Sequence, residues 1–389
     1  MSIGYIRPNV AGIEEQQILA VSKLALGDPS VIAMWYGESD LVTDADIRQT
    51  AINSLNAGET FYGHKRGLPE FQAALAGYVT GLFRQQITPN RITVTQSGMS
   101  AIMLIFQTIL DPGDNAVIIS PVWPNAQSVV RALSGTPRYA VLDNDAQRGW
   151  HLDLQKLYDQ CDERTRAIFI NTPNNPTGWV MPREQMVEVL AFARERGIWI
   201  VSDEVYSRMV YDGRAAPSLL EIAQSDDPGL VVNSFSKYFS MTGWRIGWLV
   251  VPEALVRPIE RLAQNLYISP PAISQVAALG AFDGLDELEA IKAGYARNRA
   301  MLLEELPRGG LDAILPADGA FYLYADVSRF TDDSEAFAKT MLREIGVAVT
   351  PGIDFDAVQG RRYVRLCYSG AEDAMREAAR RINAWLKTR

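Results

Sequence analysis

Residues 167–202 read AIFINTPNNPTGWVMPREQMVEVLAFARERGIWIVS, and this stretch decides the fold class. It starts and ends with short, mostly apolar runs, 167–171 and 198–202. Such runs are typical of strands that are buried on both faces of a sheet. Residues 183–196 lie between them and place apolar side chains at helical spacing, at Met186, Val189, Leu190 and Ala193. A strand, a helix and a second strand in this order predict parallel strands joined by a crossover helix.

The alternation continues on both sides of this stretch. Residues 116–120 and 230–233 are further apolar runs of strand length, so we predict an α/β fold with a doubly wound sheet. The pattern changes after about residue 286. From there the chain has a charged candidate helix at 287–305, candidate strands near 321–325, 347–349 and 363–367, a candidate helix near 334–344 and a C-terminal helix.

A chain of 389 residues exceeds what one hydrophobic core usually serves. We therefore predict a large domain at residues 41–286 and a smaller α+β domain formed by residues 1–40 together with 287–389. The N-terminal part contains a candidate helix at 44–56. An earlier helix, ending at Gly27-Asp28-Pro29, is expected from the spacing of four apolar residues, Ile13, Leu19, Leu24 and Leu26.

The composition disfavours several kinds of function. The formal net charge is -9, and an acidic balance argues against nucleic acid or an anionic membrane as the main partner. The chain has only two cysteines, Cys161 and Cys367, and two histidines, His64 and His151. Their positions predict neither disulfides, nor a metal site, nor a Ser-His-Asp mechanism. Residues 1–10 lack the apolar core of a signal peptide, and no apolar run approaches the roughly 20 residues that span a bilayer. We expect a cytoplasmic protein.

Four unusual segments are expected near strand ends, which is where open α/β sheets bind ligands. They are residues 97–101 (SGMSA), 171–178 (NTPNNPTG), 201–206 (VSDEVY) and 234–247 (SFSKYFSMTGWRIG). A small turn that opens a helix offers free N–H groups to an anion. A carboxylate that ends a buried strand is costly unless it meets a cation. A lysine among aromatic residues and serines, followed by an arginine, combines an amine nucleophile with donors for an anion.

Each segment also has a purely structural interpretation. Ser97 and Asp203 are residue types that commonly cap helices, and a loop rich in Asn and Pro is typical of a turn. Most lysines are solvated surface charges. Taken one at a time, the segments leave these alternatives open.

Taken together, the segments resemble a known series. NNPTG at 174–178, SDEVY at 202–206, SKYFSMTGWRIG at 236–247 and YVRL at 363–366 resemble the ordered motifs of the class I aminotransferases. These are the aspartate-aminotransferase-like enzymes of pyridoxal-phosphate fold type I. The resemblance runs from residues 37–40 to the C-terminal helix. It implies a mixed, mostly parallel sheet sandwiched by helices in the large domain, pyridoxal 5'-phosphate as the cofactor, an amino acid and a 2-oxo acid as substrates, and a homodimer.

The resemblance implies roles for individual residues around the cofactor ring. Lys237 would hold the cofactor as an imine and move the substrate's α-proton. Asp203 would lie against the pyridine nitrogen and keep it protonated. Tyr206 and Asn175 would hydrogen-bond the phenolic oxygen of the ring, and Trp123 would stack on its face.

Two further groups of residues are implied by the same resemblance. The α-carboxylate of the substrate would bind the planar guanidinium of Arg365, beside Gly37 and Asn175. Tyr62 would reach the phosphate of the neighbouring subunit. The donors to the phosphate from the same subunit would be Ser97, Gly98, Met99, Ser234 and Arg245.

Other functions remain open at this point. A pyridoxal-phosphate carbon–sulfur β-lyase, or another α/β-elimination enzyme, would keep Lys237, Asp203 and Arg365. A non-catalytic ligand-sensing homologue would keep the fold. A nucleotide-binding dehydrogenase is disfavoured, because no GxGxxG follows an early strand.

The choice of substrate is the last expectation. By the resemblance, Glu14-Glu15-Gln16-Gln17 lie near the side chain of the substrate. A carboxylate there would repel a second carboxylate, so we predict that neutral or basic amino acids are preferred over aspartate and glutamate. The alternative is that these glutamates begin a helix, where they suit its dipole.

Overall fold

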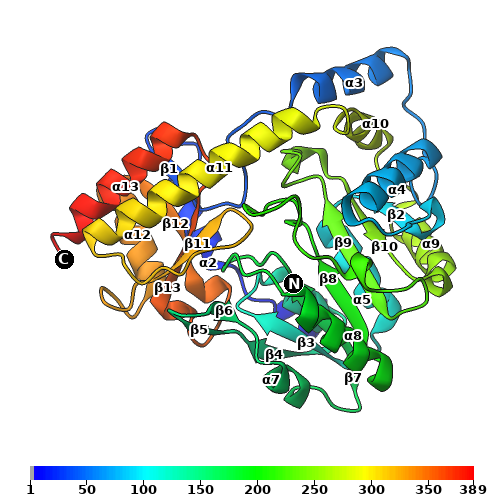
Figure 1. Ribbon diagram of the computed structural model, residues 1–389, viewed down its shortest axis with the longest axis horizontal. Helices are drawn as coiled ribbons and strands as arrows, with labels where there is room; N and C mark the ends of the chain where they lie inside the picture. Colours follow the sequence, from blue (N-terminus) through cyan, green and yellow to red (C-terminus); the bar gives the residue numbers. More distant parts are fainter. Residues whose placement is uncertain (1–3) are drawn as a thin grey trace.

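The computed structural model describes residues 4–389, whose strands fall mainly into two sheets (Figure 1). The larger sheet has the strand order β2-β10-β9-β8-β7-β3-β4. Neighbouring strands from β9 to β4 are parallel, whereas β10 runs antiparallel to β9 and β2. The mixed, mostly parallel sheet is therefore confirmed. Its strands are β2 (Ile92–Thr95), β3 (Asn115–Ser120), β4 (Thr136–Val141), β7 (Thr165–Asn171), β8 (Trp199–Asp203), β9 (Gly229–Ser234) and β10 (Gly247–Val250).

Helices cover both faces of this sheet, which explains why its strands are apolar at successive positions. In β7, Phe169 faces one hydrophobic cluster and Ile168 faces the other. On the Phe169 face lie α5 (Gly98–Ile109), α6 (Asn125–Ala132) and α9 (Glu253–Tyr267). On the opposite face lie α4 (Pro69–Phe83) and α8 (Arg183–Arg196). The expected bounds of α8 are confirmed, as is the burial of Met186, Val189, Leu190 and Ala193.

The strand directions bring several chain segments to one edge of the larger sheet. Because β3, β7, β8 and β9 are parallel, their carboxyl ends all lie there. The antiparallel strand β10 begins at the same edge, since Gly247 pairs with Ser234 of β9 and with Thr95 of β2. Segments that follow these strands are therefore neighbours in space, as expected for a ligand site in an α/β sheet.

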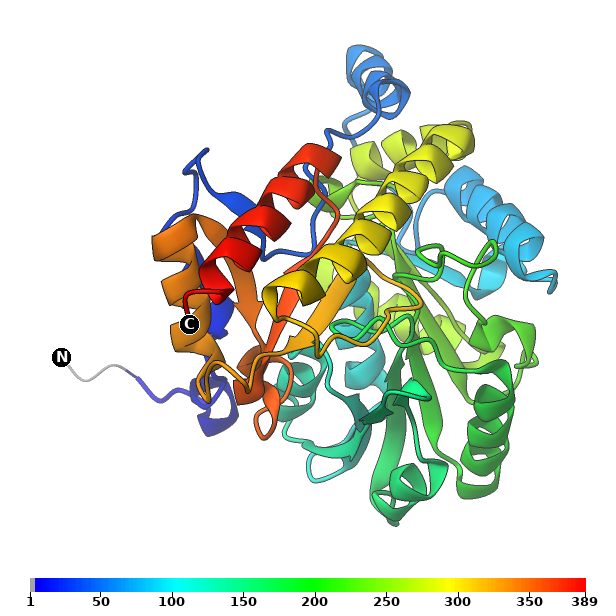
Figure 2. The same ribbon diagram turned by 60° about the vertical axis from the view of Figure 1, so that its left-hand side comes forward.

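The smaller sheet joins the two ends of the chain (Figures 1 and 2). Its order is β1-β12-β13-β11, with β1 (Ile32–Met34), β11 (Tyr322–Asp326), β12 (Val347–Pro351) and β13 (Tyr363–Cys367). Because β1 pairs in parallel with β12, the N-terminal segment lies beside the C-terminal elements, blue beside orange and red in both views. The nearby helices are α11 (Leu285–Glu305), α12 (Ser334–Ile345) and α13 (Glu372–Leu386).

The long first helix expected near the N-terminus is wrong. The structure has two short helices instead, α1 (Pro8–Ala11) and α2 (Gln17–Ser22). The four apolar residues used for that prediction are all at least 39% exposed: Ile13, Leu19, Leu24 and Leu26. The buried residues of α2 include Ile18 and Val21. The carboxylate of Asp354 binds the first N–H groups of α2, so a tertiary contact rather than local periodicity decides where this helix starts.

The second expected helix is α3 (Ala45–Asn56), and the Asp44 side chain caps it by accepting from the Asp46 N–H. The remaining α-helices and strands are α7 (Leu154–Asp159), α10 (Ala272–Gly280) and a two-stranded ribbon of β5 (Asp143–Asp145) and β6 (Gly149–His151). None of the helices within residues 4–389 combines the length and the apolar character that crossing a bilayer requires.

Candidate active site

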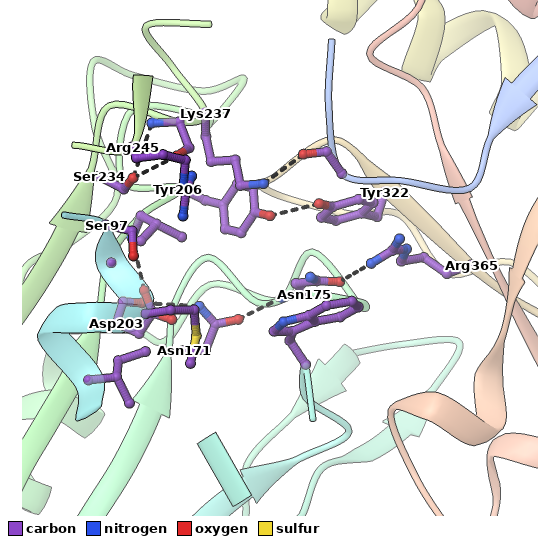
Figure 3. A pocket seen from close by; sticks show the side chains of 17 residues that line it. Ser97, Asn171, Asn175, Asp203, Tyr206, Ser234, Lys237, Arg245, Tyr322 and Arg365 are labelled. Carbon is purple, nitrogen blue, oxygen red and sulfur yellow. Dashed lines mark hydrogen bonds between the residues drawn. The ribbon is translucent and has the colours of Figure 1, made fainter. Parts of the chain in front are cut away.

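A cavity opens at the carboxyl edge of the larger sheet and extends to the smaller sheet (Figure 3). Twelve of the residues predicted for the site line it: Gly37, Ser97, Gly98, Met99, Trp123, Asn175, Asp203, Tyr206, Ser234, Lys237, Arg245 and Arg365. The other lining residues are Ile102, Asn171, Val205, Ser236 and Tyr322. Residues from both ends and from the middle of the sequence thus meet in one place.

Lys237 is half-buried and presents its amine to this cavity. Its Nζ donates to the backbone carbonyl of Gly37 at 2.6 Å and lies 5.7 Å from the centre of the Tyr206 ring. Burial lowers the pKa of Lys237 to about 8. A lowered pKa leaves more of the amine unprotonated near neutral pH, which is the form that attacks a carbonyl carbon.

Asp203 places a carboxyl group in the cavity at the end of β8. Burial raises the pKa of Asp203 to about 7, although the Val205 N–H and the Lys237 charge oppose the shift. Within residues 4–389 this carboxylate forms no salt bridge. A carboxylate in such surroundings gains most from a cationic N–H group that enters with a ligand.

Its neighbour Glu204 has a structural role instead. Glu204 is fully buried and accepts hydrogen bonds from the Ser202 and Ser218 hydroxyls and from the Leu219 N–H. These donors satisfy its carboxylate, and Glu204 does not line the cavity. The two adjacent acids of the SDEVY motif therefore differ: Asp203 faces the cavity, whereas Glu204 bonds to neighbouring segments of the fold.

The uncompensated carboxyl of Asp203 predicts a pH-dependent stability of the cofactor-free protein. The folded pKa of about 7 lies above the ordinary value of 3.8, so the folded state binds the proton more tightly and loses stability as pH rises from about 4 to about 7. Asp203→Asn should remove this penalty. We expect the variant to melt a few degrees higher than the wild type at pH 8, with a much smaller difference at pH 4.

Thermal melting of both apo-proteins across this pH range checks the expectation. Asp226→Asn, at an exposed aspartate, is the matched control and should follow the wild type. A variant that melts lower than the wild type at pH 8 would contradict an uncompensated charge.

The first turn of α5 lines the cavity with groups that could bind an anion. Ser97 caps the helix by accepting from the Ser100 N–H at 3.1 Å, and a helix start leaves the N–H groups of Gly98 and Met99 without helical partners. Gly247 permits this arrangement, since a Cβ atom there would lie 2.7 Å from the Gly98 nitrogen. The hydroxyls of Ser234 and Ser236 and the side chain of Arg245 line the same cavity.

Arg365 presents a buried cation from the smaller sheet. Its side chain is 1% exposed, and it donates to Asn175 Oδ1 at 2.8 Å, to Thr350 Oγ1 at 3.0 Å and to the Trp35 carbonyl. These acceptors are neutral, and the Arg365 Nε has no partner among the described residues. The guanidinium is therefore held in a fixed orientation with a positive charge that a carboxylate can neutralise.

Asn171 and Tyr322 belong to the cavity but were not predicted for it. Asn171 ends β7, donates to the Asp203 carbonyl at 3.1 Å and accepts from the Asn175 N–H at 2.8 Å. Its place at the start of the NTPNNPTG segment, residues 171–178, was an available signal. Tyr322 lies in an ordinary strand, and only the pairing of β11 with β13 places it near Arg365. No local pattern indicates that neighbourhood.

Two predicted features lie outside this cavity. Tyr62 is 82% exposed and borders a surface hollow formed with residues 63–67. Glu14, Glu15, Gln16 and Gln17 line a separate cavity. Phe355 also lines that cavity, and its ring packs 5.9 Å from that of Trp123, which borders the first cavity. The two cavities are therefore close neighbours.

The polar groups that line the first cavity fit pyridoxal phosphate. A helix start with serine hydroxyls and Arg245 suits a phosphate, the Asp203 carboxyl suits a protonated ring nitrogen, and the Lys237 amine suits an aldehyde carbon. These three kinds of group line one cavity. Within residues 4–389 no group of three or more His, Cys, Asp or Glu side chains is arranged to hold a metal ion.

Comparisons with known proteins point to one family. The sequence model described as "Aminotransferase class I and II" matches residues 31–382. The chain is 37% identical to a valine–pyruvate aminotransferase of Mycobacterium tuberculosis over 87% of each protein. It is 34% identical to an aspartate/prephenate aminotransferase of Thermus thermophilus over 90% of each. The crystal structure of an aminotransferase from Mycobacterium tuberculosis superposes over 100% of both chains with a TM-score of 0.92 and 32% identity.

Proposed function

Since this chain belongs to the class I and II aminotransferase family, it is a pyridoxal-phosphate-dependent aminotransferase, and we propose that Lys237 is its reactive lysine. The observation that carries this proposal is the half-buried Lys237 amine, which shares one cavity with the Asp203 carboxyl and the start of α5. The names of the relatives favour a transferase over a carbon–sulfur lyase. A purely ligand-sensing role is disfavoured because the cavity holds a complete set of reactive groups.

When bound, pyridoxal phosphate supplies an electrophilic carbon and a protonated ring that draws electrons away from the substrate's α-carbon. The N–H groups of Gly98 and Met99, with Ser97, Ser234 and Arg245, are proposed to hold its phosphate. The Asp203 carboxylate is proposed to accept the ring N–H, which would neutralise its buried charge.

The remaining cavity residues are proposed to contact the cofactor ring and the substrate. Trp123 would pack against the ring, and Tyr206 and Asn175 would hydrogen-bond its phenolic oxygen. Arg365 would bind the α-carboxylate and so fix the orientation of the α-carbon, with the Gly37 backbone beside it. The Lys237 amine, once displaced by the substrate amine, would take the α-proton as a general base and return it as a general acid.

We further propose that neutral or basic amino acids are preferred donors over aspartate and glutamate. The cations that line the cavity from this chain are Lys237, Arg245 and Arg365, and each already has a proposed partner. The neighbouring cavity is lined by the carboxylates Glu14, Glu15, Asp354 and Asp356 and by Arg131. Among the relatives, the valine–pyruvate enzyme agrees with a neutral substrate, and the aspartate/prephenate enzyme does not.

A panel of amino acids tests both the function and this preference. Aspartate, glutamate, glutamine, methionine and arginine are mixed in turn with the holoenzyme, and single-turnover rates are read from the cofactor's visible spectrum. We expect glutamine, methionine or arginine to react fastest and to yield the matching 2-oxo acid. If aspartate reacts fastest and Glu15→Ala leaves the ranking unchanged, the preference is wrong. Release of ammonia and pyruvate would instead indicate a lyase.

The active form is proposed to be a homodimer in which Tyr62 reaches the phosphate of the neighbouring subunit. Tyr62 and Phe61 are 82% and 84% exposed, which supports a surface that another protomer covers. The proposed enzyme is cytoplasmic, and its free cysteines, Cys161 and Cys367, suit a reducing compartment.

Mixed dimers test the role of Tyr62. Tyr62→Phe should weaken each site by about 10-fold or more, the size of one charge-assisted hydrogen bond. Co-assembly with Lys237→Ala protomers should restore activity, because the hybrid then has one site with both an intact Lys237 and a partner's Tyr62. If Tyr62 served its own subunit, that site would stay defective and no rescue would be seen. Tyr5→Phe, at a residue 87% exposed, is the control for an exposed tyrosine.

We also propose that the two sheets mark two domains. The larger sheet lies wholly within the proposed large domain at residues 41–286, and the smaller sheet is built from residues within 1–40 and 287–389. Residues 1–3 of the proposed small domain lie outside the described residues.

A further inference from the structure

Two tyrosine hydroxyls form a direct link between the two sheets (Figure 3). The hydroxyls of Tyr206 and Tyr322 lie 2.7 Å apart. Tyr206 follows β8 of the larger sheet, and Tyr322 begins β11 of the smaller sheet. Both side chains are buried, with exposed fractions of 3% and 0%. The hydrogen bond therefore lies inside the cavity that both residues line.

The surroundings indicate which hydroxyl donates. A bond between two protonated hydroxyls uses one proton and leaves the other free. Among residues 4–389 the Tyr322 hydroxyl has no other partner than Tyr206. The Gly37 backbone fills the space beside it, because a Cβ atom built on Gly37 would overlap that hydroxyl. Donation from Tyr322 to Tyr206 therefore satisfies Tyr322 and leaves the Tyr206 proton free for a ligand in the cavity.

The Tyr322 ring makes a second contact of interest. The guanidinium carbon of Arg365 lies 4.3 Å from the centre of this ring, which is within the range of a cation–π contact. Tyr322 and Arg365 lie on the neighbouring strands β11 and β13. One side chain thus touches both Tyr206, which faces the lysine, and Arg365, the proposed carboxylate clamp.

We propose that Tyr322 is a positioning residue for transamination. Its hydroxyl orients the Tyr206 hydroxyl toward the cofactor's phenolic oxygen, and its ring supports the Arg365 guanidinium. The inference rests on the roles proposed above for Tyr206 and Arg365. It requires both tyrosines to stay protonated, and burial raises the pKa of Tyr206 and of Tyr322 above the ordinary value.

Tyr322→Phe tests the hydroxyl, because this change keeps the ring. A weaker hydrogen bond from Tyr206 stabilises the anionic phenolic oxygen less, so the pH midpoint at which the holoenzyme's visible band titrates should rise. We expect a rise of about half a pH unit to one unit, the size of one net hydrogen bond. KM for the amino acid should change little, since the contact of the ring with Arg365 remains.

A double-mutant comparison shows whether Tyr322 acts through Tyr206. Tyr206→Phe alone should raise the midpoint further than Tyr322→Phe does. Adding Tyr322→Phe to Tyr206→Phe should then cause no additional rise. Tyr324→Phe is the matched control, because Tyr324 is on the same strand, is 2% exposed and donates to the Gly352 carbonyl instead; its midpoint should equal that of the wild type.

The outcomes separate this inference from the function on which it rests. A shift with Tyr206→Phe but none with Tyr322→Phe overturns the inference and leaves the role of Tyr206 intact. No shift with Tyr206→Phe overturns both. An equal shift by Tyr322→Phe with and without Tyr206→Phe shows that Tyr322 does not act through Tyr206, which also overturns the inference.

Tyr322→Leu tests the ring. This variant should raise KM for the amino acid above the KM of Tyr322→Phe, because Arg365 loses its shortest aromatic contact and keeps only those with Phe355 at 4.8 Å and Trp123 at 5.8 Å. Equal KM values for the two variants overturn that part of the inference. Should Tyr322→Leu fail to fold, Tyr322→Met, which keeps a flexible apolar side chain without the aromatic face, makes the same comparison.

Discussion

Lys237→Ala is expected to abolish both turnover and the pH-dependent visible band of the holoenzyme. The Lys237 amine is the only lysine nitrogen that lines the cavity of the described chain, beside the Gly37 carbonyl and the Tyr206 ring. Without it, the site loses its nucleophile and its acid–base group together. Acid–base catalysis alone contributes about 10²- to 10⁴-fold, so we expect kcat to fall by at least about 10⁴-fold.

Two measurements check the assignment of Lys237. Borohydride reduction of the holoenzyme, followed by peptide mapping, should place the cofactor on Lys237. Labelling of any other lysine would end the assignment. Lys292→Ala removes a lysine whose side chain is 12% exposed and paired with Glu289, and this control should keep the visible band.

Arg365→Ala is expected to lower kcat/KM by about 10- to 100-fold or more, the size of one or more charge-assisted hydrogen bonds. The guanidinium is buried, and its known contacts are to neutral acceptors. Removing it leaves a substrate carboxylate without this cationic partner. Arg365→Lys should recover little activity, because an ammonium cannot form the paired hydrogen bonds of the planar group.

Substrates with and without a carboxylate distinguish a role of Arg365 in substrate binding from a purely structural role. Amines that lack a carboxylate should be affected far less by Arg365→Ala than amino acids are. An equal loss for both would rule out a carboxylate clamp. Arg362→Ala is the control, since Arg362 is near in sequence but half exposed and paired with Asp326; its kcat/KM should remain close to that of the wild type.

Much of the fold could be read from the sequence because its signals are local. The buried strands β3, β7, β8 and β9 are short apolar runs, and α8 has regular helical spacing. The antiparallel β10 (residues 247–250) was not predicted as a strand, because it follows directly on the motif that carries Lys237 and Arg245. The N-terminal helix was wrong because Asp354, far along the chain, decides where α2 begins.

The site could be predicted to the extent that its residues lie in motifs. The strand ends that carry Asp203 and Ser234 follow from the parallel order of the sheet. Tyr322 lies in no such motif. Its position depends on the pairing of β11 with β13 and on the close approach of the Gly37 backbone. Contacts between the two sheets produce no periodic pattern or motif in the sequence, so they could not be predicted from it.

The pairing of β1 with β12 has a consequence for the order in which the enzyme is made. Thr350 donates to the Trp35 carbonyl across 315 residues of chain, and this contact holds the segment that carries Gly37. During synthesis the larger sheet, complete at residue 250, can form while the ribosome is still adding the last third of the protein. The segment that carries Gly37 can make this contact only after β12 has been synthesised, and Arg365 follows β12 in the chain. Lys237, the proposed reactive lysine, is therefore synthesised well before Arg365, the proposed carboxylate clamp, so we expect a nascent chain to form the proposed cofactor pocket before its proposed substrate contacts.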